Sequence, residues 1–211
     1  MHDPKHDSAA RRRQVRRRRR DAAWLAAKLP EGSGERTLLS VAYRIARQRG
    51  IAPSLLVTVI FQESQFYHGT RWEPFWTELF ILTRRFPCKR LRNKSLGLTS
   101  IKPRVAQRLA REAGLGSLNQ ARSAELVARD HSVALELAAL ELSQLKARGA
   151  TDAVAFLCYA ATVSTREALL QDENAVLANS GAFRHRLRDF YQHSPEAREL
   201  TVECPSEVDG C

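Results

Sequence analysis

Signals that begin and end helices recur along this chain, and strand signals do not. Gly50, Gly114 and Gly149 each follow an apolar pattern of helical period, where a residue in the left-handed conformation commonly ends a helix. Pro53 and Pro103 stand where a first helical turn tolerates them, because that turn does not need their missing N–H. No turn dipeptide joins two alternating apolar runs, so no hairpin is indicated. The sequence therefore predicts an all-α fold.

The helical pattern falls into separate segments. We expect helices over residues 21–29, 36–49, 53–67, 73–85, 103–113, 118–128, 131–148, 152–163 and 181–193. Residues 117–120 fit a capping box, in which two side chains satisfy free amides at a helix start. Thr151 and Ser180 are expected to be N-caps, since each precedes a helical pattern with a hydroxyl that accepts from a first-turn amide.

The chain is expected to form one domain with a tail at each end. With 211 residues and 44% hydrophobic content, it can bury one good core. We place the domain at residues 23–195, a basic tail at 1–22 and a C-terminal tail at 196–211. Residues 1–30 contain ten Lys or Arg against three Asp, which is +7 of the formal net charge of +11. The positive charge is therefore concentrated at the N-terminus.

The basic tail, residues 1–22, is expected to be disordered. Its arginine runs repel one another in isolation and are stabilised when they lie along a polyanion. Nucleic acid, teichoic-type polymers and acidic lipid surfaces are candidate partners. A solvated arm without a specific partner is the alternative.

The cysteines and histidines do not indicate a metal site. Cys88, Cys158, Cys204 and Cys211 include no Cys-x-x-Cys pair, and no histidine stands at metal-site spacing from them. Cys158 lies in an apolar run and is expected in the core. Cys204 and Cys211 close a small disulfide loop in one interpretation and are free thiols in the other. We expect no metal and no cofactor.

Glu63 is the candidate catalytic residue. A helix over this region places apolar side chains at its neighbouring positions, with Val59 and Ile60 one turn before it and Phe66 and Tyr67 one turn after. A carboxyl group on such a face loses hydration, which disfavours its charged form and suits a proton donor. The alternative is that Glu63 bends to water or pairs with one of the many arginines.

Three blocks of the sequence resemble motifs of the soluble lytic transglycosylases and goose-type lysozymes. Residues 50–66 end in Glu-Ser-Gln-Phe, similar to the Glu-Ser-x-Phe that ends the helix carrying the family's acid. Residues 95–103 resemble its Ser-x-x-Gly-Leu-Met-Gln-Ile-x-Pro segment, and residues 155–162 resemble its Ala-Tyr-Asn-Ala-Gly motif. The blocks follow the family's order over roughly residues 42–164.

The resemblance implies a lysozyme-like helical domain with a substrate cleft. It implies cleavage of peptidoglycan glycan strands at the β-1,4 bond between MurNAc and GlcNAc, with Glu63 as the single general acid and base. The substrate's acetamido group would stabilise the cation, and the product would be a 1,6-anhydro sugar or, if water arrives first, a hydrolysed one. The substrate-binding residues that it implies are Ser64, Ser95, Gly97, Ser100 and Tyr159.

The segment from residue 68 to residue 94 adds aromatic and acidic candidates. Trp72 is expected to be an exposed platform, since aromatic planes stack on the apolar faces of sugar rings. Glu73 and Glu78 are the nearest candidates for a second carboxylate opposite Glu63, which a two-acid hydrolysis would need. Most of the other aromatics there are expected to pack in the core.

The departures from the family motifs support two alternatives to cleavage. Thr99-Ser100 replaces the family's Met-Gln, and Ala160 and Thr162 replace its Asn and Gly. A lysozyme-like scaffold that binds glycan without cleaving it is therefore one alternative. A helical nucleic-acid-binding protein that uses the basic tail is the weaker one, because no named reader motif is present.

The sequence does not indicate a classical export route. The basic run is followed by an apolar stretch, within residues 21–30, that is interrupted and too short for a secretory signal. No uncharged apolar run approaches the length that crosses a bilayer. If the chain acts on cell wall, we expect unconventional export, lysis from within, or a leader that this sequence lacks.

Overall fold

A computed structural model describes residues 38–63 and 97–202 of the chain. These residues form helices and no strand, which confirms the all-α prediction. The helices are α2 (Leu38–Gln48), α3 (Pro53–Glu63), α6 (Pro103–Glu112), α7 (Gln120–Arg129), α8 (His131–Ala147), α9 (Asp152–Ala160), α10 (Val163–Gln171), α11 (Glu173–Asn179) and α12 (Gly181–Val202).

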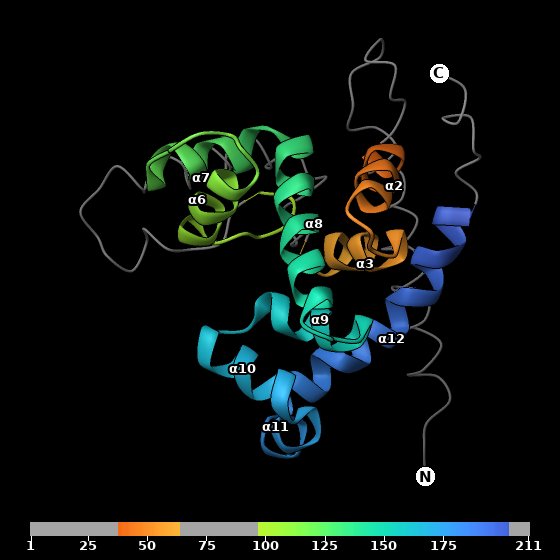
Figure 1. Cartoon of the computed structure of the whole chain (residues 1–211). Coiled ribbons are helices and arrows are strands. Elements are labelled where there is room, and N and C mark those ends of the chain that lie inside the picture. The colour runs from red at the N-terminus through yellow and green to blue at the C-terminus, as the bar shows by residue number, and fades with distance from the viewer. Residues whose placement is uncertain (1–37, 64–96, 203–211) are drawn as a thin grey trace, which may run out of the picture.

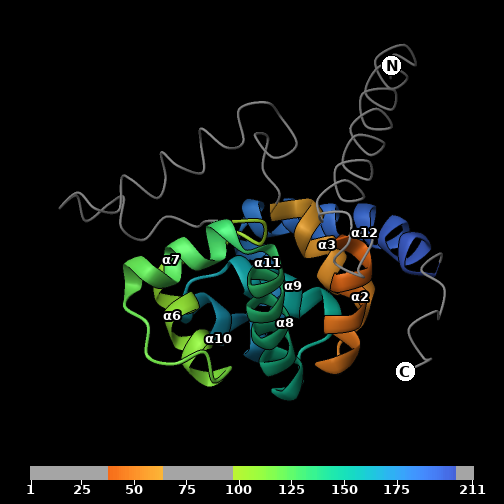
Figure 2. The same ribbon diagram turned by 90° about the horizontal axis from the view of Figure 1, so that it is seen from above.

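Helix α8 runs through the middle of the described fold and contacts α2, α3, α6, α7 and α9 (Figure 1). Seen from above, α6 and α7 lie on one side of α8, whereas α2 and α3 lie on the other (Figure 2). Helix α12 packs against α3 and α9, so the C-terminal part of the chain returns to the helix that carries Glu63. This return decides which side chains meet Glu63.

Helix α3 is buried on nearly all sides. Its residues from Leu55 to Phe61 are all buried, and its last residue, Glu63, is 9% exposed. The one polar side chain in the middle, Thr58, donates to the backbone oxygen of Ser54 at 2.7 Å, which satisfies its hydroxyl within the helix. A helix that is apolar all round needs partners on several faces, and α2, α8, α9 and α12 provide them.

Several predicted helices are confirmed. Helices α2, α6, α7 and α8 match the predictions to within two residues at each end. Gly50, Gly114 and Gly149 follow α2, α6 and α8 with φ values of 68°, 76° and 88°, the left-handed conformation expected of them. Helix α3 begins at Pro53 as predicted, and the rest of the predicted segment 53–67 lies outside the described residues.

The prediction for the C-terminal third is wrong in two places. The helix expected over 152–163 ends at Ala160, and two unpredicted helices, α10 and α11, follow it. The hydroxyl of Thr162 and the carboxyl of Asp172 accept from first-turn amides and so begin these two helices. The helix expected over 181–193 runs on to Val202 and includes Pro195, a residue that more often kinks or ends a helix.

The helix caps match the sequence in part. Thr151 accepts from the amide of Val154 at 3.2 Å, and Ser180 accepts from that of Phe183 at 3.4 Å, as predicted. The capping box at 117–120 is wrong, because Asn119 is the N-cap of α7 and accepts from the amide of Arg122 at 2.8 Å. Asparagine is as good an N-cap as serine, so the helix starts later than predicted.

Asp130 ends α7 and begins α8, and we expect Asp130→Ala to lower the free energy of unfolding by about 1 kcal/mol. Its carboxyl accepts from the amide of Val133 at 3.1 Å and from the hydroxyl of Ser132 at 2.7 Å. Asp130→Asn is the control, since asparagine keeps an oxygen at the same place. Urea denaturation of the three proteins measures the difference. Equal stability of the alanine variant and the unchanged chain would contradict the assignment of this cap.

Other predictions lie outside the part of the chain that the structure describes. These are the basic tail at 1–22, the helices at 21–29 and 73–85, and residues 203–211 of the C-terminal tail. The division into one domain and two tails stays a prediction. None of the helices within residues 38–63 and 97–202 has the length and apolar character to cross a bilayer. The same residues contain no group of three or more His, Cys, Asp or Glu placed to hold a metal ion.

Candidate functional site

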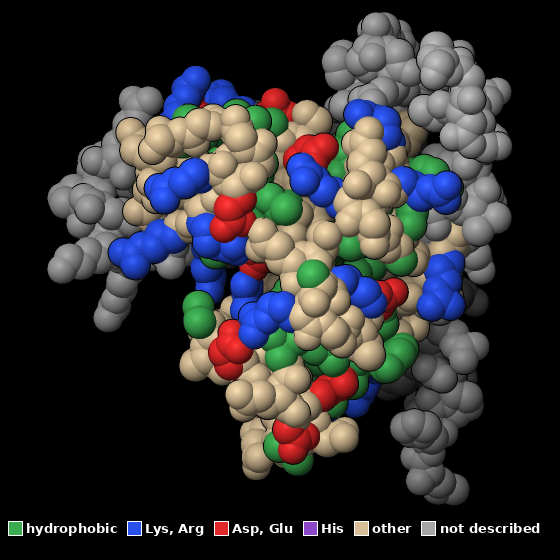
Figure 3. All heavy atoms as spheres, in the orientation of Figure 1, with side chains coloured by type: hydrophobic (Ala, Val, Ile, Leu, Met, Phe, Trp, Pro, Cys, Tyr) green, Lys and Arg blue, Asp and Glu red, His purple; other side chains and the backbone are tan. Residues whose placement is uncertain are grey.

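A cavity of about 330 Å³ lies next to the end of α3. Its volume is in the range of small-ligand pockets. It is lined by Glu63, Ser100, Ile101, Lys102, Arg104, Val105, Leu109, Glu141, Tyr159, Ala160, Ala161, Thr162, Val163 and Arg166. In the space-filling view, Lys and Arg side chains gather around the recess between α6 and α10 (Figure 3). The three sequence blocks singled out above thus contribute to one cavity.

Glu63 lies at the wall of this cavity and is paired with an arginine. Its carboxyl oxygen Oε1 forms an ion pair with Nη2 of Arg186, which comes from α12. Both side chains are mostly buried, with exposed fractions of 12% for Glu63 and 17% for Arg186. Of the two alternatives left open for Glu63, pairing with an arginine is the one in this structure. Of the four apolar neighbours expected from the sequence, Val59 and Ile60 are fully buried, and Phe66 and Tyr67 lie outside the described residues.

Arg186 is held in place by an aromatic ring as well as by Glu63. Its guanidinium carbon lies 4.7 Å from the centre of the Phe156 ring, close enough for a cation–π interaction. Its Nε is buried and has no hydrogen-bond partner among the described residues. Arg186 therefore uses only part of its hydrogen-bonding capacity within the described residues.

A tight turn connects the second sequence block to Glu63. In this turn, the amide of Ser100 donates to the backbone oxygen of Gly97 at 3.1 Å. The hydroxyl of Ser100 donates to the backbone oxygen of Glu63 at 3.0 Å, and Ser100 has a φ of 50°, in the left-handed region. Ser100 thus fixes the end of α3, which is a different role from the amide contact to substrate that the family motif implies.

Gly97 is required for packing against α7. Its φ is 72°, and a Cβ atom built on it would lie 2.1 Å from the backbone oxygen of Val127. Gly97 does not line the cavity. The space beside Gly97 is occupied by α7, and the substrate-binding role that the resemblance implies for Gly97 stays a prediction.

Tyr159 lines the cavity, but its hydroxyl is already engaged. The O–H donates to the backbone oxygen of Thr99 at 2.8 Å, and the hydroxyl of Thr99 donates to the backbone oxygen of Ala134 at 3.2 Å. Burial raises the pKa of Tyr159 well above its ordinary value, and the nearby Glu63 carboxylate acts in the same direction. Tyr159 is therefore a neutral phenol that ties α9 to the turn at residues 97–100.

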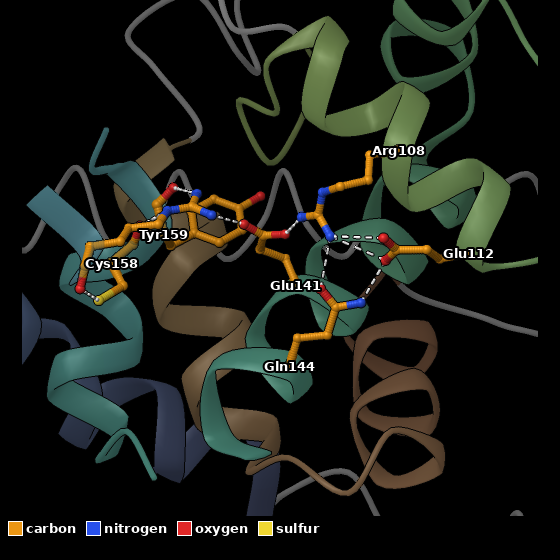
Figure 4. Close-up of polar contacts among 7 residues, drawn as sticks. Arg108, Glu112, Glu141, Gln144, Cys158 and Tyr159 are labelled. Carbon is orange, nitrogen blue, oxygen red and sulfur yellow. Dashed lines mark hydrogen bonds and ion pairs between the residues drawn. The ribbon is translucent and has the colours of Figure 1, made fainter. Parts of the chain in front are cut away.

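A second carboxylate in the cavity wall, Glu141, is held between two arginines. It comes from α8, is 2% exposed, and forms ion pairs with Arg108 of α6 and Arg166 of α10. In the close-up, Arg108 and Glu141 point toward one another, and Arg108 also reaches Glu112 and Gln144 (Figure 4). A buried carboxylate needs such partners to offset its lost hydration. Glu141 joins three helices around the cavity.

Arg166 also holds the end of α9. Its Nε donates to the backbone oxygen of Cys158 at 2.7 Å, and its Nη2 donates to that of Tyr159 at 3.2 Å. The last carbonyls of a helix have no partner within the helix, and an arginine can supply one. Glu141 therefore positions Arg166, and Arg166 fixes the turn from α9 to α10 that forms one wall of the cavity.

Sequence reasoning missed both Glu141 and Arg186. The pattern that singled out Glu63 also surrounds Glu141, with Leu137 and Ala138 one turn before it and Leu145 one turn after. Applying the same criterion to every helix would have found it. Arg186 has no local signal, because it stands 123 positions from Glu63 along the chain.

Cys158 is buried in this region, and we expect it to resist alkylation. Burial raises the pKa of its thiol to about 11, so the reactive thiolate is rare near pH 8. Peptide-resolved mass spectrometry should show alkylation at least roughly 100-fold slower in the folded than in the denatured chain. The fold favours the neutral thiol, so this group's contribution to stability is lost as pH rises through about 11. Equal rates in both states would contradict the burial.

The remaining candidate site residues lie outside the described residues. These are Ser64, Trp72 and Ser95, together with the possible second carboxylates Glu73 and Glu78. Their roles stay predictions from the sequence. Of the candidates that the structure does describe, Glu63, Ser100 and Tyr159 meet at the cavity.

No family profile matches the chain, and no curated protein or solved structure matches it either.

Proposed function

We propose that this protein cleaves the β-1,4 glycan strands of peptidoglycan, with Glu63 as its single general acid and base. The observation that carries the proposal is the position of the Glu63 carboxyl. It is largely buried, ends an apolar helix, and lies in the wall of a cavity of about 330 Å³. An acid held in an apolar wall beside a ligand-sized space is the arrangement that glycosidases use. The motif resemblance adds the substrate class.

The reaction requires Glu63 to exchange one partner for another. In the mechanism that the resemblance implies, its carboxyl protonates the glycosidic oxygen and then accepts the proton of the sugar's 6-hydroxyl or of water. The guanidinium of Arg186 binds one carboxyl oxygen of Glu63 in this structure. A bound glycan would have to displace Arg186 from Oε1 or approach the other carboxyl oxygen of Glu63. The Phe156 ring would continue to hold the guanidinium of Arg186 when the ion pair is broken.

Among the described residues, Glu141 is the only other carboxylate that lines this cavity. Both of its oxygens are bound by arginines, so it has no free oxygen with which to attack a sugar or activate water. This pairing argues against Glu141 as the second carboxylate of a two-acid scheme. The substrate's own acetamido group then supplies the stabilisation that a second carboxylate would give.

Glycan binding without cleavage is the second candidate, and two observations favour it. The ion pair with Arg186 engages the group that would have to donate the proton. Ser100 and Ala160 stand where the family motifs have amides, and the Ser100 hydroxyl is used for the backbone of Glu63. A protein of this kind would bind glycan in the cavity without cleaving it.

Mass spectrometry of material released from purified bacterial walls separates the two candidates. If the protein cleaves, soluble muropeptides appear, and their masses distinguish a 1,6-anhydro end from a reducing end. If the protein sediments with the walls and releases nothing, the proposal of cleavage is wrong and the binding function stands. If the protein releases nothing and also does not sediment with the walls, both candidates are wrong.

A further inference from the structure

The cavity wall carries two cations whose charges are not neutralised. Both carboxylates of the cavity wall are already paired. Glu63 pairs with Arg186, and Glu141 pairs with Arg108 and Arg166. Lys102 and Arg104 also line the cavity, and neither forms an ion pair or a side-chain hydrogen bond within residues 38–63 and 97–202. Within the part of the chain that the structure describes, the cavity therefore presents free positive charge and no free negative charge to a ligand.

Lys102 and Arg104 follow the turn that is hydrogen-bonded to the end of α3. Lys102 follows two residues after Ser100, whose hydroxyl is bonded to the backbone of Glu63. Lys102 and Arg104 line the same cavity as Glu63, so a glycan bound there would meet all three side chains.

The start of α6 adds to this positive charge. Lys102 is the N-cap of α6 and provides no side-chain hydrogen bond to its first turn, which also contains no acidic residue. Arg104 and Val105, in that first turn, both line the cavity. The positive end of the helix dipole therefore acts in the same direction as the two side chains.

We infer that this cavity selects a glycan that carries a carboxylate, and that Lys102 and Arg104 bind that carboxylate. The inference rests on the proposed function for the position of the glycan, and it names the substrate class and two specificity residues of the same site. Side-chain cations bind carboxylates through charge-assisted hydrogen bonds, which are stronger than those to neutral groups. A neutral glycan of equal length would lose these contacts and leave both cations unpaired.

The test compares two probes that differ by one carboxylate-bearing group. One is the neutral tetramer of β-1,4-linked N-acetylglucosamine, and the other is the same tetramer carrying one carboxymethyl ether. Calorimetry with the full chain should show at least about tenfold tighter binding of the carboxylated probe. Lys102→Gln combined with Arg104→Gln should remove this preference and leave the affinity for the neutral probe unchanged.

A matched control distinguishes this site from general charge attraction. Arg111→Gln combined with Arg188→Gln removes the same charge from residues that do not line the cavity, and it should keep the preference. An equal loss in both double variants, an equal affinity of the unchanged chain for both probes, or no binding of either would overturn the inference. A preference that depends on Lys102 and Arg104 in a protein that releases nothing from walls would support it and overturn cleavage instead.

Two sources of the carboxylate remain to be distinguished by the same measurement. In an acidic glycan the group stands on the sugar, whereas in a peptide-bearing glycan it stands at the end of the peptide. A muramic-acid disaccharide with a free lactyl carboxylate and the same disaccharide with a short peptide on it serve as probes. The disaccharide that the unchanged chain binds more tightly identifies the source of the carboxylate. The Lys102→Gln and Arg104→Gln variant should bind both disaccharides with equal affinity, and an unchanged difference in affinity would contradict the inference.

Discussion

Gly97→Ala is expected to lower the free energy of unfolding by about 3 kcal/mol or more. The left-handed conformation costs a residue with a Cβ about 1–2 kcal/mol, and an overfilled contact adds about 1–3 kcal/mol. Both apply here, because φ is 72° and the new Cβ would lie 2.1 Å from the backbone oxygen of Val127. Backbone cannot rotate away as a side chain can, so α7 or the turn at residues 97–100 would have to move.

Gly114→Ala is the matched control for this prediction. Gly114 has a φ of 76°, but nothing lies within 4 Å of the Cβ that would be added. The Gly114→Ala variant should therefore lose only the conformational part of the free energy of unfolding, about 1–2 kcal/mol. Urea denaturation of both variants measures the difference. An equal loss at the two positions would show that α7 does not approach Gly97 as closely as the structure indicates.

Glu63→Gln is expected to lower the rate of glycan release from walls by about a thousandfold. Glutamine keeps the size of the side chain and can still accept a hydrogen bond from Arg186, but it cannot donate the proton of a carboxylic acid. Release of muropeptides over time, followed by mass spectrometry, measures the rate. A variant that retains more than about a tenth of the rate would contradict the role of Glu63 as the acid.

The controls for Glu63→Gln address its buried ion pair. Removing one partner of such a pair leaves the other charge uncompensated and destabilises the fold, so circular dichroism must show that the variant is folded at the assay temperature. Glu136→Gln breaks a different pair, in which Arg49 lies 3.1 Å from Glu136 and which does not line the cavity. It should release glycan at the rate of the unchanged chain.

The sequence predicted the helical architecture where local signals decide it. Glycines after α2, α6 and α8 and prolines at the starts of α3 and α6 mark those helices because their backbone requirements are local. The break between α9 and α10 was not predicted, although Thr162, which begins α10, is a residue type that favours the N-cap position. A cap is as local a signal as a glycine, and it is weaker only because serine, threonine and aspartate also occur elsewhere.

The candidate site was predictable in part. The apolar surroundings of Glu63 follow from helical spacing, and its burial is found. Its partner Arg186 was not predictable, because the contact depends on how α12 packs against α3. Gly97 shows the same limit, since a positive φ and a close approach are expected of such a glycine, but only the tertiary structure shows that the approaching group is α7.

A crystal structure of the Glu63→Gln variant with an uncleaved, carboxylate-bearing glycan tests the central claim most directly. The account predicts the glycan in the cavity, with a glycosidic oxygen within about 3 Å of the side chain at position 63 and with Arg186 no longer blocking that approach. A glycan bound elsewhere, or one in the cavity whose glycosidic oxygens all lie beyond hydrogen-bonding reach of position 63, would contradict it.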